Sequence, residues 1–119
     1  MPTQHDENDK AALLQGTLDL LILRTLIFGQ QHGQGIARAI HRQSDEVFSV
    51  DHGSLYLALA RLEEKSWISA KWGLSENNRR ARYYSLTAKG RAQLARKTSQ
   101  WRRISSAIAR ILGPEEAEV

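Results

Sequence analysis

Apolar residues in the first half of the chain recur at steps of three and four, the spacing that lines one face of a helix. The first such series is Leu14, Leu18, Leu21, Ile22 and Leu26. It predicts a helix from about residue 13 to residue 28, ended by Gly29. A second, short helix is predicted from near Gly35 to the residue before Ser44, with Gly33 and Gly35 allowing a sharp turn between the two helices.

A third helix is predicted to follow Ser49 or Asp51, because either side chain can accept a hydrogen bond from a free N–H group of the first turn. Its buried stripe consists of Leu55, Leu59 and Leu62. The opposite side holds Gly53, Leu57, Ala60, Arg61 and Glu64, with Tyr56 on its flank. These side chains are mostly small or unbranched, which suits close approach to the wall of a DNA groove.

Residues 67–72 alternate between apolar and polar side chains, and residues 81–86 are rich in strand-forming types. The segment between them, residues 73–80, is rich in turn-forming residues, so the three segments together predict a β-hairpin. Thr87 is placed to cap a last helix, from about residue 88 to residue 112, which Gly113 and Pro114 end.

The last helix is long for so small a protein and carries its own apolar series. The series is Leu94, Trp101, Ile104, Ile108 and Ile111. Its spacing matches a coiled-coil seam, and a seam that projects beyond a small core needs a partner, most often a second copy related by a two-fold axis. Packing on the first helix of the same chain is the alternative. Trp101 is then either part of the dimer core or one wall of a flat ligand pocket between subunits.

Length and composition fit one compact domain with an appended element, since the chain has 119 residues, 41% of them hydrophobic and 25% charged. No apolar run approaches the ~18 residues of a membrane span, and the amino terminus lacks the basic and apolar regions of a signal peptide. We therefore expect a cytoplasmic protein with no membrane partner. The absence of cysteine excludes disulfides, thiol catalysis and thiolate zinc sites.

The net charge of +4 understates how unevenly the charges are distributed. Six of the thirteen acidic residues lie in the two tails: Asp6, Glu7, Asp9, Glu115, Glu116 and Glu118. Residues 65–103 contain eleven lysines and arginines against one acid, Glu76. Such a block attracts polyanions, although a solvated helix face is the simpler explanation of any single cation within it.

Several residues of the third helix are candidate DNA contacts. The Tyr56 hydroxyl can bind a phosphate, or else the residue is a core tyrosine. Ser54 and His52 lie at the amino end of the helix, where the dipole and the free N–H groups favour an anion. Arg61 could read a guanine or pair with Glu64, and Leu57 could touch a thymine methyl group or simply tolerate exposure.

The basic residues of the hairpin supply the other candidate contacts. Arg79 and Arg80 are expected to bind phosphates, with a solvated hairpin tip as the alternative, and Lys71 adds a cation on the first strand. Arg82 is expected either to join them or to pair within the hairpin.

An enzymatic site is not expected, and neither is a cofactor. Asp51, His52 and Ser54 are the residue types of an acyl-transfer triad, but neighbours on one helical turn point outward and do not converge. The four histidines, at positions 5, 32, 41 and 52, lack the close spacing of a metal site. A winged helix that binds only another protein is the more serious alternative, and the basic block favours DNA over it.

The order of these residues resembles the PadR family of bacterial transcriptional regulators, from about residue 14 to residue 112. The similar stretches are Gly16-Thr17-Leu18-Asp19-Leu20-Leu21, His32-Gly33-Gln34-Gly35-Ile36-Ala37, Gly53-Ser54-Leu55-Tyr56, Leu59-Ala60-Arg61-Leu62-Glu63, Arg82-Tyr83-Tyr84 with Leu86-Thr87, and Gly90. Two positions depart from the family pattern. Leu57 follows Leu55-Tyr56 where the family usually has proline, and Ser66 stands where a glycine usually follows the third helix.

The resemblance implies a mainly α fold with a small β-hairpin, a winged helix-turn-helix followed by one long dimerisation helix. It implies a repressor that binds double-stranded DNA at a palindromic operator as a homodimer and that a small-molecule effector releases. On this basis we divide the chain into a flexible arm (1–11), a DNA-binding domain (12–87), a dimerisation helix (88–113) and an acidic tail (114–119).

Overall fold

The computed structural model describes residues 17–114. Residues 17–25 are helical and lead into a short 3-10 helix, η1 (Leu26–Phe28), which ends at Gly29 with a φ of 134° that favours glycine. The predicted end of the first helix is therefore confirmed. Its predicted start, the whole amino-terminal arm and nearly all of the acidic tail lie outside the described residues.

The second helix, α2 (Gly33–Gln43), begins two residues earlier than predicted, because the His32 side chain caps it by accepting a hydrogen bond from the Gly35 N–H group at 3.0 Å. The turn predicted at Gly33 and Gly35 is wrong, since both residues lie within the helix and neither has a positive φ. Their lack of a side chain serves packing instead. A Cβ on Gly33 would overlap the Tyr56 phenol, and one on Gly35 would overlap the Gln31 side chain.

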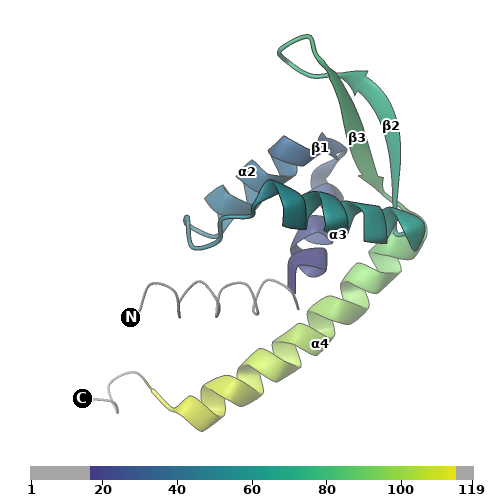
Figure 1. The fold of residues 1–119 in the computed structure, drawn as a ribbon. Coiled ribbons are helices and arrows are strands. Elements are labelled where there is room, and N and C mark those ends of the chain that lie inside the picture. The colour runs from purple at the N-terminus through teal and green to yellow at the C-terminus, as the bar shows by residue number, and fades with distance from the viewer. Residues whose placement is uncertain (1–16, 115–119) are drawn as a thin grey trace.

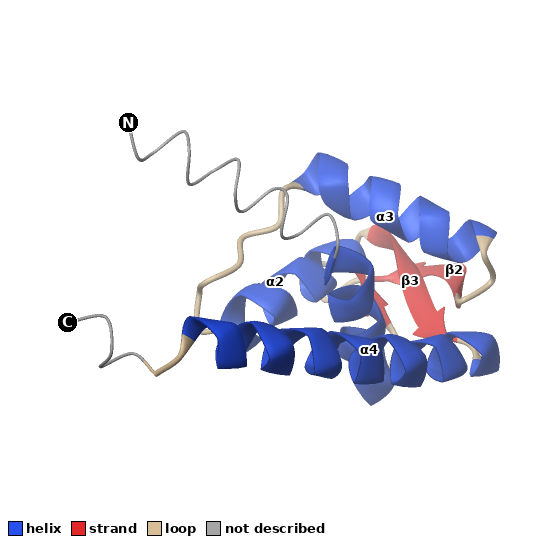
Figure 2. Cartoon of the chain, turned by 90° about the horizontal axis from the view of Figure 1, so that it is seen from below, coloured by secondary structure: helices blue, strands red, loops and turns tan. Residues whose placement is uncertain are grey.

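The third helix, α3 (His52–Glu64), starts after Asp51, which caps it in place of the alternative Ser49. The fourth, α4 (Ala88–Leu112), is capped by Thr87 and ends at Gly113, as predicted. In Figure 2 α3 and α4 run along opposite sides of the molecule, with α2 and the sheet between them.

The hairpin is formed by β2 (Ile68–Leu74) and β3 (Arg80–Leu86), with Ile68 paired to Leu86 and Leu74 to Arg80. Both strands run further toward the tip than predicted, and the connecting turn comprises only residues 75–79. A two-residue strand that was not predicted, β1 (Gln31–His32), pairs with β3 and gives the sheet order β1-β3-β2. We call this hairpin, residues 68–86, the wing; in Figure 1 its tip projects past α3.

One hydrophobic core joins the helices with strands β2 and β3. Its largest fully buried side chains are Ile22, Leu23, Leu26, Ile36, Leu55, Leu59, Leu62 and Ile68. The predicted stripe of α3 is thus confirmed. Leu94 also belongs to this core and is only 5% exposed. Its assignment to a dimer seam is therefore corrected, because its surface is already covered by its own chain.

The rest of the α4 series lies beyond this core. Trp101, Ile104 and Ile108 are 38, 46 and 48% exposed, and Ile111 is 84% exposed. Figure 1 shows α4 leaving the body of the molecule along this stretch. Within residues 17–114 no helix combines the length and apolarity required to cross a membrane.

Candidate nucleic-acid interface

Helix α3 separates its side chains into two faces. Leu55, Ala58, Leu59 and Leu62 are buried, whereas the opposite side, predicted from the sequence to be exposed, is exposed along its whole length. Leu57 has 68% of its surface exposed and Tyr56 has 44%. Leu57 lies at the centre of this face, and no other part of the described chain covers it.

The amino end of α3 already holds a negative charge. The Asp51 carboxylate accepts a hydrogen bond from the Ser54 N–H group at 2.8 Å and another from the Ser54 hydroxyl at 3.1 Å. These hydrogen bonds, the backbone one first, hold the pKa of Asp51 below its usual value. The anion site predicted around Ser54 is therefore partly occupied by this side chain, and a phosphate there would have to lie beside Asp51.

Replacing Asp51 with alanine is expected to lower the free energy of unfolding by about 1 kcal/mol, because the first turn of α3 loses its cap. Asp51 has a lowered pKa in the folded state, so its stabilising effect is present above the unfolded-state pKa and is lost as the pH falls through the folded-state pKa. Denaturant unfolding of both proteins at neutral and acidic pH measures this. A stability difference that stays constant as the carboxylate is protonated would contradict the capping role.

Tyr56 is held in a fixed position on the exposed side of α3. Its ring stacks parallel to that of His52, with centroids 6.1 Å apart and planes inclined by 4°. Its phenol rests on the backbone of Gly33 in α2. The alternative of a core tyrosine applies instead to Tyr84, which is 4% exposed and whose phenol pKa is raised by burial. His52 thus faces Tyr56, while Ser54 faces Asp51.

Arg61 and Arg82 form ion pairs within the chain. Arg61 was expected to meet a guanine or Glu64, but its Nη2 atom donates to Asp19 Oδ1 at 2.7 Å, which ties α3 to the first helix. Arg82 was expected either to bind a phosphate or to pair within the hairpin. It binds Glu63 of α3 through two hydrogen bonds, of 3.1 and 2.8 Å, and so fixes the wing against α3. Arg61 therefore holds α3 against the first helix, and Arg82 holds the wing against α3.

The other cations of the wing do not form ion pairs within residues 17–114. Lys71, Arg79 and Arg80 are exposed, and among residues 17–114 no carboxylate lies within ion-pairing distance of any of them. Arg80 lies over the Trp72 ring, with its guanidinium carbon 4.5 Å from the ring centroid. The tip is ordered by its own hydrogen bonds, from Ser75 N–H to the Arg79 carbonyl and from Asn78 N–H to the Ser75 carbonyl, each 2.8 Å long.

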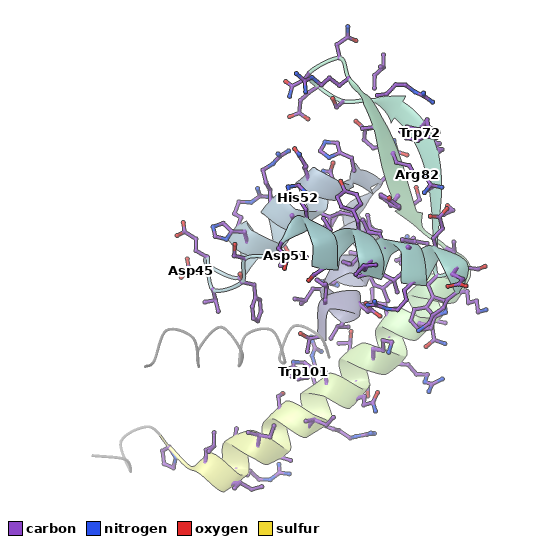
Figure 3. The ribbon with its side chains drawn as sticks, in the orientation of Figure 1. Asp45, Asp51, His52, Trp72, Arg82 and Trp101 are labelled. Carbon is purple, nitrogen blue, oxygen red and sulfur yellow. The ribbon has the colours of Figure 1, made fainter. Side chains whose placement is uncertain are left out.

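The wing, Tyr56 of α3 and the start of α2 line an open hollow of about 710 Å³. Its walls carry Tyr56, Trp72, Arg38, Arg79, Arg80 and Arg82, with Glu76 as the single acid. Figure 3 shows Trp72 and Arg82 on the hairpin above α3, with Asp51 and His52 at the amino end of that helix. An open, cationic hollow beside an uncluttered helix face is suited to a rigid polyanion.

Arg38 and Trp72 line this hollow but were not predicted from the sequence to contact DNA. Arg38 is one cation within a short helix, so no local pattern marks it. Trp72 is one of the apolar residues that alternate with polar ones along β2, so the pattern alone predicts a packed side chain. Its exposure depends on where α3 stops covering the sheet.

A family model for the transcriptional regulator PadR-like family matches residues 22–96 of this chain. The chain belongs to the PadR-like family of transcriptional regulators. This family comprises DNA-binding transcriptional regulators and not enzymes, and the winged-helix fold predicted from the resemblance is confirmed.

Solved structures agree with the PadR assignment. A transcriptional regulator from Clostridium thermocellum is 31% identical, with a TM-score of 0.74 over 82% of this chain and 94% of that one. A PadR family transcription regulator from Clostridium difficile is also 31% identical, with a TM-score of 0.70 over 82% of this chain and 99% of that one.

The chain is also similar in sequence to an uncharacterised protein from Lysinibacillus sphaericus, which is 27% identical over 83% of this chain and 91% of its own length.

The structure shows what one departure from the PadR pattern costs. Ser66, where a glycine usually follows the third helix, has a φ of 65°. This left-handed conformation is the one that glycine adopts without steric cost. Ser66 therefore keeps the turn between α3 and β2 at the expense of backbone strain.

Proposed function

We propose that this PadR-family protein is a repressor that binds a palindromic operator as a homodimer, with α3 in the major groove and the wing on the flanking backbone. The observation that carries the proposal is the hollow between α3 and the wing. There the guanidinium groups of Arg38, Arg79 and Arg80, which have no carboxylate partner within residues 17–114, stand beside the exposed face of α3. Because Arg61 and Arg82 are ion-paired, we assign phosphate contact to the other arginines first.

In this proposal the remaining α3 residues divide by position. Tyr56 binds a phosphate at the mouth of the hollow, and Leu57 contacts the groove floor, where a thymine methyl group suits an apolar side chain. His52 and Ser54 border the same strand at the amino end of α3. Lys71 lies on the outer side of β2 and contributes charge at longer range.

The dimer in this proposal forms along the exposed part of α4, through Trp101, Ile104, Ile108 and Ile111. A row of half-exposed and exposed apolar residues at heptad spacing favours a second helix as its cover. A two-fold axis would then place two α3 helices about 34 Å apart, one turn of the duplex. Residues 12–87 thus read DNA and residues 88–113 assemble the dimer.

Release by a small-molecule effector completes the proposal, with Trp101 as the wall of a pocket between subunits. A second hollow, between α4 and the first helix of the same chain, is lined largely by arginines and hydroxyl side chains. Trp101 does not line it. An effector pocket that includes Trp101 therefore needs a second chain to close it.

Footprinting on the promoter of its own gene, followed by binding measurements on the protected duplex at several salt concentrations, tests this function. We expect a two-fold symmetric footprint and an affinity that falls steeply with salt, since counterions are released from phosphates. A protein-interaction module would show weak binding with a shallow salt dependence, and that result would exclude the proposal.

Replacing Arg80 with alanine is expected to weaken binding to specific and random duplexes by a similar factor, because phosphate contacts carry no sequence information. The slope of log affinity against log salt should fall by about 1. Fluorescence anisotropy with both duplexes measures these quantities. Arg96, exposed on α4 and away from the hollow, is the matched control, and an Arg80→Ala slope equal to that of Arg96→Ala would remove the wing from the interface.

A further inference from the structure

Trp72 and Leu74 form an apolar patch on the face of the wing that continues the core. Alternate residues of β2 share one face of the sheet, and along Ile68, Trp72 and Leu74 the exposed fraction rises from 1 to 59 and 63%. The change occurs at the Glu63–Arg82 ion pair, where the hairpin register places Arg82 opposite Trp72. Beyond this point α3 no longer covers this face of the sheet. The Trp72 indole therefore has no hydrophobic core to pack against.

The indole is nevertheless held in a defined orientation. The Arg80 guanidinium lies over its ring at 4.5 Å, a cation–π contact between adjacent strands. With 59% of the side chain exposed, this contact covers only part of the ring. The wing therefore presents a flat apolar surface and a guanidinium group side by side.

Both groups line the hollow that Tyr56 and Arg38 border from the other side. A DNA strand offers a matching alternation, because each charged phosphate is followed by a deoxyribose with apolar C–H groups. Protein contacts to the DNA backbone include both phosphate and sugar. Aromatic rings supply large contact areas at low conformational cost.

We propose that Trp72 packs against a deoxyribose of the strand that passes between α3 and the wing, while Arg80, held over the indole, contacts a phosphate next to that sugar. This inference rests on the proposed DNA binding and assigns to the wing a contact that does not depend on salt. It differs from stacking on an unpaired base, which would require single-stranded nucleic acid.

The test compares Trp72→Ala and Trp72→Phe with the unaltered full-length protein by anisotropy, on a random-sequence duplex and on the operator, over a range of salt concentrations. For Trp72→Ala we expect binding about tenfold weaker on both duplexes, since the lost contact is apolar and independent of sequence, and an unchanged salt slope. Trp72→Phe should retain most of the affinity, because it keeps an aromatic face.

Tryptophan fluorescence gives a second readout that does not depend on affinity. The difference in emission between the unaltered protein and Trp72→Phe isolates Trp72, and we expect saturating duplex to quench this difference signal. Equal thermal unfolding of all three proteins shows that the exposed position does not alter the fold.

Other results would overturn the inference. Wild-type affinity for Trp72→Ala, or no quenching of Trp72, excludes the sugar contact. A salt slope reduced by about 1, as for Arg80→Ala, would mean that Trp72 only orients Arg80. Tighter binding to single strands than to duplex, lost in Trp72→Ala, would indicate base stacking. Failure of the unaltered protein to bind duplex at low salt would overturn the proposed function as well.

Discussion

Replacing Gly90 with alanine is expected to lower the free energy of unfolding by about 2 to 4 kcal/mol. A Cβ at this position in the first turn of α4 would overlap the backbone carbonyl oxygen of Trp67, and it would lie 2.9 Å from the Leu86 side chain. A backbone atom cannot move aside as a flexible side chain can. Either α4 or the start of β2 must therefore shift.

The shift would also disturb the hydrogen bonds that begin α4. The Trp67 carbonyl accepts hydrogen bonds from the Thr87 N–H group at 3.1 Å and from the Thr87 hydroxyl at 3.0 Å. The same hydroxyl accepts from the Gly90 N–H group at 3.0 Å. Alanine gains about 1 kcal/mol over glycine in a helix interior, which is too little to offset these losses.

Thermal unfolding measures the effect, and Gly53→Ala is the matched control. Gly53 also lies near the start of a helix, but a Cβ there would meet only an Asp51 carboxylate oxygen, at 3.4 Å. We expect Gly53→Ala to be neutral or slightly stabilising and Gly90→Ala to lower the melting temperature by about 10 °C or more. Equal melting temperatures for the two variants would show that α4 does not pack directly on the Trp67 backbone.

Replacing Ile108 with glutamate is expected to convert the proposed dimer into monomers and to abolish operator binding. Ile108 is 48% exposed in the single chain, so a charge there costs the monomer little. In a dimer seam two symmetry-related carboxylates would be buried close together without partners, at a cost of several kcal/mol. A monomer with one α3 helix also loses the second half-site, and with it the affinity that the linked sites provide.

Sedimentation velocity across a range of concentrations gives the assembly state, and anisotropy on the operator gives the affinity. Ser106→Glu is the matched control, because it adds the same charge two residues away, on the opposite side of α4. We expect the control to remain a dimer and to bind DNA. If both variants sediment as the unaltered protein does, the seam is not along Ile108 and the dimer lies elsewhere.

The sequence alone was sufficient wherever the decisive interactions are local. Caps act within one turn, so Thr87 and Gly113 marked the ends of α4, and Gly29 marked the end of the first helix. Helical periodicity was equally sufficient for the two faces of α3, since a face that buries Leu55, Leu59 and Leu62 leaves Leu57 exposed. The PadR family followed from motifs in a fixed order.

Contacts between distant segments needed the tertiary structure. Asp19 and Arg61 are 42 residues apart and Glu63 and Arg82 are 19 apart. Many acids and arginines of this chain could pair equally well by charge, and only the fold selects these pairs. β1 has two residues, too few for any alternation to show, and it forms because β3 has a free edge beside it.

By itself the sequence determined the order and type of the helices, the hairpin, the basic character of the wing and the family. The tertiary structure decided which arginines are ion-paired and which remain available, that Leu94 belongs to the core, and that Trp72 is exposed. The physical reason is that periodicity and capping depend on neighbours within a few residues, whereas burial and ion pairing depend on which surfaces the folded chain brings together.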